Sequence, residues 1–137
     1  MVIRYNYLWA DDAASGLPEA SKERPSAIVV ALADGSSEIL RCVVVPITHS
    51  EPKNEADALE IPPAVCRSAG LDAARSWVVM TEYNEFNWPG YDIAHVPGKD
   101  PPSFVYGFLP IGFLQIMRER WQALRGAGLS RSVDRDD

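Results

Sequence analysis

The sequence predicts a mainly β fold with helices, of the α+β class, in which one amphipathic helix closes a small barrel-like sheet. Three observations carry this prediction. Several short apolar runs bounded by turn residues are typical of neighbouring antiparallel strands. Near the C-terminal end, Leu114, Met117, Trp121 and Leu124 recur at spacings of three and four, the period of one helix face. The apolar content of 47% in 137 residues fits one ordinary hydrophobic core.

The first three strands of this sheet are predicted over residues 3–9, 26–33 and 39–46. A loop rich in small and polar residues follows the first strand over 11–22, because Gly16 and Pro18 exclude a helix there. Between the second and third strands, Asp34-Gly35-Ser36-Ser37 is a run of turn residues. These two strands are therefore predicted to form an antiparallel hairpin.

The second half of the chain is predicted to alternate short strands with helices. An exposed turn over 49–56 is followed by strands over 59–61, 77–81 and 104–109. Pro62-Pro63 opens a short helix through Ala69, and Gly70 ends it, since proline is tolerated in a first turn and glycine suits a helix end. Prolines and glycines make 82–103 a long excursion with room for one hairpin but not for a central strand. The last helix covers 111–124.

Composition and charge narrow the classes of function. The chain is expected to form one domain over residues 1–125, followed by a flexible tail over 126–137. Cys42 and Cys66 lack metal-ligand spacing and are expected to be free thiols in a reducing cytoplasm. No apolar stretch approaches the ~20 residues of a membrane span. With a net charge of −6 and three lysines, we expect weak, salt-sensitive binding of short single strands rather than tight duplex binding.

The ends of the predicted hairpin bring two polar side chains together. Arg24 precedes the second strand, and Thr48 follows the third. Because these ends of paired antiparallel strands are neighbours in space, a guanidinium and a hydroxyl are expected to meet there. Pro25 restricts the backbone of Arg24 to an extended form, which limits the reach of the guanidinium. A surface arginine that braces a loop is the alternative interpretation of Arg24.

These two blocks resemble the PemK/MazF family of toxin endoribonucleases from bacterial toxin–antitoxin modules. The resemblance lies in Arg24-Pro25-Ser26-Ala27-Ile28-Val29-Val30 and in Val44-Val45-Pro46-Ile47-Thr48. Further pieces follow in the family's order: Tyr7-Leu8-Trp9, Gly16 with Glu19, Leu59-Glu60-Ile61-Pro62, Gly70-Leu71, Ser76-Trp77-Val78-Val79 and Tyr106-Gly107-Phe108-Leu109-Pro110. The match spans roughly residues 5–124. It implies an SH3-like small barrel of the CcdB/PemK/MazF type with a C-terminal helix, and a homodimer.

The resemblance also implies a growth-inhibiting toxin that cleaves single-stranded RNA without a metal or other cofactor. In that reaction the 2′-hydroxyl attacks the phosphate, and the enzyme neutralises charge on the pentacoordinate phosphorus. Arginine suits this task because its planar fork meets two phosphate oxygens, and a threonine hydroxyl donates to the same oxygens. By resemblance, Arg24 and Thr48 are the catalytic pair. The implied partners are single-stranded RNA and a cognate antitoxin protein in the cytoplasm, with no membrane and no direct contact to DNA.

Four further residues are expected to bind the substrate: Lys22, His49, Ser50 and Glu82. An imidazole suits proton transfer, but His49 faces away from Thr48 unless the strand ends there, whereas Ser50 shares the side of Thr48. Glu82 has three interpretations. It acts as a general base whose proton affinity is raised by partial burial, it repels phosphate at the edge of the cleft, or it lies in a solvated acidic loop.

One departure from the family pattern leaves a second function open. Where members commonly carry a polar pair followed by a basic residue, this chain has Thr81-Glu82-Tyr83-Asn84-Glu85, with no lysine or arginine before Lys99. A degenerate, non-catalytic interaction module that binds a protein is therefore the alternative, and a regulatory protein that binds a small ligand is a further one. Tyr83, Phe86 and Trp88 fit base stacking, a small core of the loop or a protein-binding surface. Because phosphate-binding glycine loops, Cys/His sets and nicotinamide fingerprints are absent from the sequence, no cofactor and no metal are expected.

Overall fold

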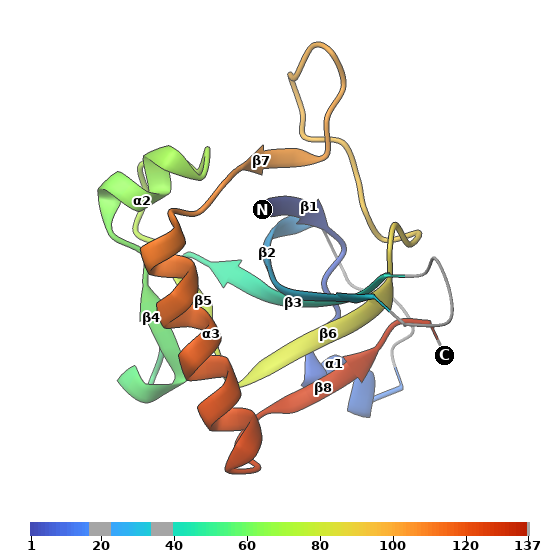
Figure 1. The fold of residues 1–137 in the computed structure, drawn as a ribbon, viewed down its shortest axis with the longest axis vertical. Coiled ribbons are helices and arrows are strands. Elements are labelled where there is room, and N and C mark those ends of the chain that lie inside the picture. The colour runs from blue at the N-terminus through green and yellow to red at the C-terminus, as the bar shows by residue number, and fades with distance from the viewer. Residues whose placement is uncertain (17–22, 34–39, 137) are drawn as a thin grey trace.

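The computed structural model describes residues 1–16, 23–33 and 40–136 and has an α+β fold. Pro18, Glu19, Lys22 and the predicted turn over 34–37 lie outside these ranges. In chain order the elements are β1 (Val2–Tyr5), α1 (Ala10–Ala14), β2 (Arg24–Ala33), β3 (Leu40–Thr48), the 3-10 turn η1 (Glu55–Asp57), β4 (Ala58–Glu60), α2 (Pro63–Ser68), β5 (Trp77–Val79), β6 (Glu82–Asn87), β7 (Val105–Gly107), α3 (Ile111–Gly126) and β8 (Arg131–Asp134). Within the described residues, an eight-stranded sheet is crossed on one side by α3 (Figure 1).

β3 is the central strand of the sheet because it pairs with three neighbours. The antiparallel pairing with β2 confirms the predicted hairpin. On its other edge, β3 pairs with β6 along its first half and with β5 through Ile47 and Thr48. β5 and β6 therefore lie end to end along this edge, separated by Met80 and Thr81. The strand order is β4-β5-β3-β2-β1-β7, and β8 runs parallel to β6.

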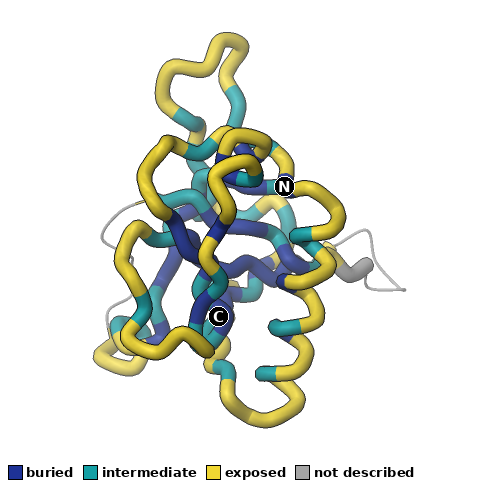
Figure 2. Tube along the Cα trace, turned by 90° about the vertical axis from the view of Figure 1, so that its left-hand side faces the viewer, coloured by how far each residue is buried: buried dark blue, intermediate teal, exposed yellow. Residues whose placement is uncertain are grey.

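Side chains of β3 alternate between two cores, because successive residues of a strand point to opposite faces. Val43 and Val45 belong to the core that also contains buried residues of α3. Val44 belongs to a second core with Tyr5 and Phe86, whose rings stack with 5.0 Å between centroids. Figure 2 shows these buried strands at the centre of the molecule, with exposed loops around them.

The predicted C-terminal helix is confirmed as α3. It begins directly after Pro110, whose missing N–H is tolerated in a first helical turn. Met117 and Trp121 are buried in the first core, and the Trp121 ring packs edge to face on Tyr83 with 5.5 Å between centroids. None of the helices in the described ranges has both the length and the apolar character needed to span a bilayer.

The structure corrects the sequence prediction in three places. Residues 10–14 form α1, where a loop is predicted. Residues 82–87 form β6, where the excursion is predicted to begin, and its Tyr83 and Phe86 are buried core residues rather than a base-stacking surface. Residues 131–134 form β8, where a flexible tail is predicted.

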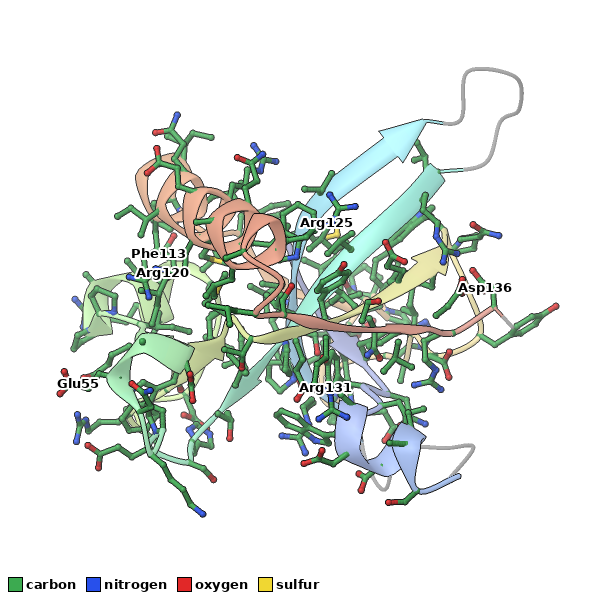
Figure 3. The ribbon with its side chains drawn as sticks, turned by 90° about the horizontal axis from the view of Figure 1, so that it is seen from below. Glu55, Phe113, Arg120, Arg125, Arg131 and Asp136 are labelled. Carbon is green, nitrogen blue, oxygen red and sulfur yellow. The ribbon has the colours of Figure 1, made fainter. Side chains whose placement is uncertain are left out.

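β8 is fixed by contacts between segments that are far apart in the chain. The side chain of Arg135 is only 7% exposed, and it donates to the carbonyl oxygen of Asn6 and to Asp92, both at 2.8 Å. Arg131 pairs with Asp11 of α1 at 2.6 Å and lies beside that helix in Figure 3. The local sequence carries no signal for these contacts, so the strand was not predictable from its own composition.

The excursion is shorter than predicted and covers residues 88–104, and the part of it that leads to β7 protrudes from the sheet (Figure 1). It contains no hairpin, and one isolated bridge joins Ile93 to Tyr5 of β1. Trp88 packs edge to face on Phe104 with 5.6 Å between ring centroids, which closes the base of the excursion. Trp88 and Phe104 both pack against the second core of the sheet, so Trp88 extends that core rather than forming a separate one.

Candidate functional site

A cleft of about 1020 Å³ opens where the two strands of the central hairpin separate. The β2–β3 ladder ends at the pair Ser26 and Pro46. Beyond this pair, Arg24 stays with β1 and Thr48 stays with β5, so the strand ends diverge. Pro25 and Pro46 lack N–H donors at this point, which favours the end of the ladder. Arg24 and Thr48, the predicted catalytic pair, both line the resulting cleft.

Arg24 is a half-buried cation without a carboxylate partner among the described residues. Its guanidinium carbon lies 4.9 Å from the ring centroid of Trp9, a cation–π contact. Its Nε atom is buried and has no hydrogen-bond partner among the residues that the structure describes. Burial lowers the pKa of Arg24 below its ordinary value, and Tyr7 acts in the opposite direction. An arginine stays charged under such a shift, so this site favours an incoming anion.

Thr48 presents a hydroxyl group at the other side of the cleft. Its Oγ1 accepts a hydrogen bond from the backbone N–H of Ser50 at 3.1 Å. This bond uses a lone pair, so the hydroxyl hydrogen remains to be donated to a ligand. Ser50 is exposed and also lines the cleft, as predicted for a residue on the side of Thr48.

His49 lies in the same cleft because β3 ends at Thr48, which frees His49 from the alternation of the strand. Its Nδ1 is 2.9 Å from the carbonyl oxygen of Arg75 and 3.2 Å from the hydroxyl of Ser76. Its Nε2 is 3.2 Å from a carboxylate oxygen of Asp72. The ring is thus held between the end of β3 and the segment that precedes β5.

Two predicted substrate-binding residues are not in the described part of the cleft. Lys22 lies outside the described residues. Glu82 does not line the cleft, and its Oε1 accepts bonds from the Tyr7 hydroxyl at 3.1 Å and from the Ala10 N–H at 2.9 Å. Burial raises the pKa of Glu82, while the bonds from Ala10 and Tyr7 lower it. The direction matches the expected rise in proton affinity, but this carboxyl group joins the N-terminal segment to β6.

Carboxylates outnumber cations among the described lining residues. The carboxylates are Glu23, Glu51, Asp57 and Asp72, and the cations are Arg24 and Lys53. Glu23 pairs with Arg4 at 3.8 Å, so part of this negative charge is balanced within the protein. Within the described lining, a polyanion therefore meets an attractive field only close to Arg24 and Lys53.

Sequence reasoning missed two residues of this cleft, Trp9 and Asp72. Trp9 precedes α1 and lies against Arg24, whereas the sequence places it in the first strand. Asp72 follows Gly70 in a short connection, and no local pattern distinguishes it from an ordinary surface carboxylate. Both depend on pairing across the sheet, which brings these distant segments to the open end of the hairpin.

Within residues 1–16, 23–33 and 40–136, no group of three or more His, Cys, Asp or Glu side chains is placed to hold a metal ion. Comparison with protein-family models, curated proteins and solved structures finds no match to this chain. The interpretation of the cleft therefore depends on its own chemistry.

Proposed function

We propose that this protein is a metal-independent endoribonuclease that cleaves single-stranded RNA in the cleft between Arg24 and Thr48. The observation that carries the proposal is that both residues line one cleft, where Arg24 is partly desolvated and has no carboxylate partner among the described residues. A phosphodiester supplies the anion that such an arginine lacks. The Thr48 hydroxyl is a second donor in the same cleft, and two donors together suit the charged oxygens of a phosphoryl group during cleavage.

The chemistry follows from these two groups. The 2′-oxygen attacks the neighbouring phosphorus, and the bond from phosphorus to the 5′-oxygen breaks. The products are a 2′,3′-cyclic phosphate and a 5′-hydroxyl, so the proton that leaves the 2′-oxygen is balanced by one gained at the 5′-oxygen. Arg24 donates to the non-bridging oxygens as their charge grows, and the Thr48 hydroxyl donates to the same group.

The acidic surroundings limit the substrate to a short segment. Long duplexes and extended strands place many phosphates beside Glu51 and Asp57, which repel them. A flexible single strand brings one phosphate to Arg24 and turns the others toward solvent. Binding is expected to weaken as salt rises, with a shallow slope that reflects few phosphate contacts.

The wider role proposed for this activity is that of a growth-inhibiting toxin of a type II toxin–antitoxin module in the PemK/MazF family. The two motifs that contain Arg24 and Thr48 support it. The eight-stranded sheet, in which β3 pairs with three neighbours, is compatible with the SH3-like barrel of the CcdB/PemK/MazF type, which we propose as the fold. The proposed setting is the cytoplasm, with a homodimer and a cognate antitoxin protein, and without a membrane or direct DNA contact.

The test is incubation of the protein with a pool of single-stranded RNA in EDTA. We expect cleavage that leaves 2′,3′-cyclic phosphate and 5′-hydroxyl ends. The matched control is the same pool with 2′-O-methyl groups, which removes the attacking hydroxyl and should remain intact. Intact RNA across all sequence contexts, or equal cleavage of the 2′-O-methyl pool, would contradict the proposal.

A non-catalytic interaction module on the same fold is the second candidate. It is favoured by the four carboxylates that line the cleft, since they oppose a polyanionic substrate. Growth arrest that persists in an Arg24→Ala variant, together with intact RNA in the assay above, would support this module instead of the nuclease.

A further inference from the structure

The bonds of His49 define which of its nitrogen atoms faces the cleft. The Arg75 carbonyl oxygen accepts hydrogen bonds but never donates them, so Nδ1 must carry a hydrogen to bond it at 2.9 Å. The hydrogen bond from Nδ1 to this backbone carbonyl therefore fixes the orientation of the imidazole ring. Nε2 is the nitrogen that remains for a ligand, and it points to the carboxylate of Asp72 at 3.2 Å.

Asp72 and His49 form an exchangeable pair. Their side chains are 65% and 56% exposed, so solvent and ions reach both groups. Exposed pairs of this kind contribute little to stability and are readily displaced. His49 lines the same cleft as Arg24, so one ligand can reach both side chains.

We propose that Nε2 of His49 is a second phosphodiester-binding position of the cleft, and that Asp72 occupies this position as an internal anion in the free protein. This inference rests on the proposed function, because the ligand is an RNA phosphate held next to the one at Arg24. The carboxylate oxygen of Asp72 stands where a phosphate oxygen binds, and the incoming strand displaces it. Asp72 is thus a competitor for the substrate rather than a ligand of it.

Substitution of Asp72 is expected to strengthen RNA binding rather than weaken it. Asp72→Asn removes the competing charge but keeps the size of the side chain, so we expect it to tighten RNA binding by about two- to fivefold, the range for an exposed ion pair. His49→Gln removes the ring nitrogen at which the phosphate binds and should weaken binding. In the double variant His49→Gln/Asp72→Asn, the gain from Asp72→Asn should vanish, because the position at which Asp72 competes is gone.

The experiment measures the affinity of a fluorescent 2′-O-methyl oligoribonucleotide by anisotropy at constant salt. The oligonucleotide is not cleaved, so only binding is observed. Glu119→Gln is the matched control, since it removes one negative charge from the exposed surface of α3, away from the cleft lining. Its effect measures the general influence of net charge. Equal gains for Asp72→Asn and Glu119→Gln, no gain for Asp72→Asn, or a gain that persists in the double variant would overturn the proposal.

A second measurement separates this proposal from the proposed function. Arg24→Ala should abolish the anisotropy signal, and if it does not, the nuclease assignment fails. The His49 position is then judged on the wild-type protein by NMR of labelled histidine rings during a titration with inorganic phosphate. The sequence contains two histidines, and the exposed His95 of the excursion is the internal control. Movement of the Nε2 resonance of His49 without a matching change in His95 supports the site, and equal or no movement contradicts it.

Discussion

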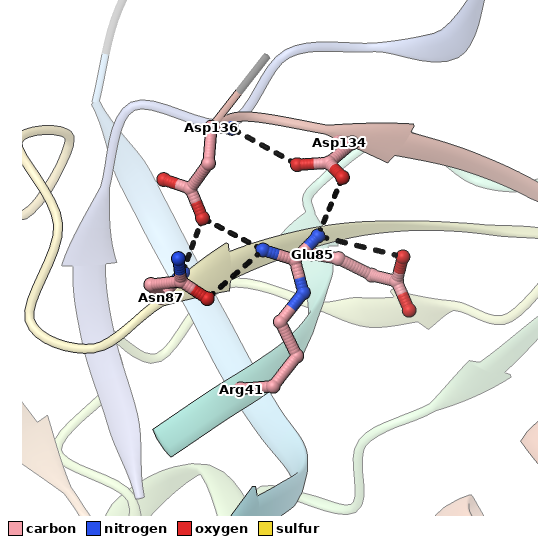
Figure 4. A network of polar contacts seen from close by, with 5 residues as sticks. All are labelled: Arg41, Glu85, Asn87, Asp134 and Asp136. Carbon is pink, nitrogen blue, oxygen red and sulfur yellow. Dashed lines mark hydrogen bonds and ion pairs between the residues drawn. The ribbon is translucent and has the colours of Figure 1, made fainter. Parts of the chain in front are cut away.

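Arg24 and Arg41 lie at opposite ends of the same hairpin and have opposite surroundings. Arg41, at the turn end, contacts Asp134 and Asp136 at 2.7 Å each and also faces Glu85 at 3.8 Å (Figure 4). The hydrogen bond that Arg41 donates to the carboxylate of Asp134 is the main cause that raises the pKa of Arg41. For Arg24, at the open end, burial lowers the pKa, and no described carboxylate pairs with it.

Arginine therefore serves two purposes in a single hairpin. The carboxylates around Arg41 come from β6 and from the segment that ends the described chain, so this arginine joins β3 to β8. Its charge is balanced within the protein and has little left for an external anion. The charge of Arg24 is not balanced by a described group, so an anionic ligand that binds there would stabilise the guanidinium.

The largest expected effect concerns activity at the open end. Arg24→Ala should lower kcat/KM for RNA cleavage by about 10²–10³-fold, the range for loss of one donor to a developing oxyanion. The free energy of unfolding should change by less than about 1 kcal/mol, because a cation–π contact with Trp9 is the main interaction lost. Single-turnover cleavage and urea unfolding measure the two quantities. Arg24→Lys is the matched variant, since it keeps the charge without the planar fork.

Gly70, at the open end of the hairpin, has a structural role that Arg24 lacks. Gly70 lines the cleft with φ +72°, and a Cβ atom there would lie 2.1 Å from the carbonyl oxygen of Tyr106. Gly70→Ala should therefore lower the free energy of unfolding by about 2–4 kcal/mol. Gly98, with φ +79° and no atom within 4 Å of a Cβ, is the control and should cost only about 1 kcal/mol as alanine. Equal losses in urea unfolding would contradict the close approach.

At the turn end, Arg41→Gln should show the reverse of Arg24→Ala. We expect a loss of about 1 kcal/mol in the free energy of unfolding, because the network is partly exposed and screened by solvent. RNA cleavage should stay within about twofold of the wild type. A large loss of cleavage in a folded Arg41→Gln protein would show that Arg41 also acts on the substrate.

The smallest effect is a change in pH dependence at Glu82, a half-buried carboxyl group outside the cleft. Since burial raises its pKa in the folded protein above the reference value of 4.5, the native state binds the proton more tightly than the unfolded state. Its contribution to stability is complete below pH 4.5 and declines as pH rises through the folded value. Glu82→Gln should remove this decline, because an amide oxygen still accepts from Tyr7 and Ala10.

The measurement is the difference in unfolding free energy between Glu82→Gln and the wild type, from acid pH to neutrality. The variant should gain relative to the wild type as pH rises. If the difference in unfolding free energy stays constant, or if the variant gains stability toward acid pH, then burial does not raise the free energy of the ionised carboxyl group.

Local patterns predicted the hairpin and the helix α3, since the alternation at Val43, Val44 and Val45 and the spacing of Met117 and Trp121 are properties of single segments. The meeting of Arg24 and Thr48 in one cleft also followed, because it needs only the pairing of consecutive strands.

Elements that depend on distant segments could not be predicted in this way. β8 needs the parallel pairing with β6 and the burial of Arg135 against Asn6. The pair of His49 and Asp72 needs the pairing of β3 with β5, which brings the segment before β5 to the cleft. Glu82 was expected near the substrate. Its actual partners, Tyr7 and Ala10, are more than 70 residues away in the chain, so the sequence around Glu82 does not reveal them.

The most direct test of the central claim is the shift in melting temperature that a 2′-O-methyl oligoribonucleotide causes in the wild type, Arg24→Ala and Arg41→Gln proteins. A ligand that binds only the folded state raises the melting temperature according to its affinity. We predict equal shifts for the wild type and Arg41→Gln, and no shift for Arg24→Ala. A full shift in Arg24→Ala would show that the open end of the hairpin does not hold the phosphodiester.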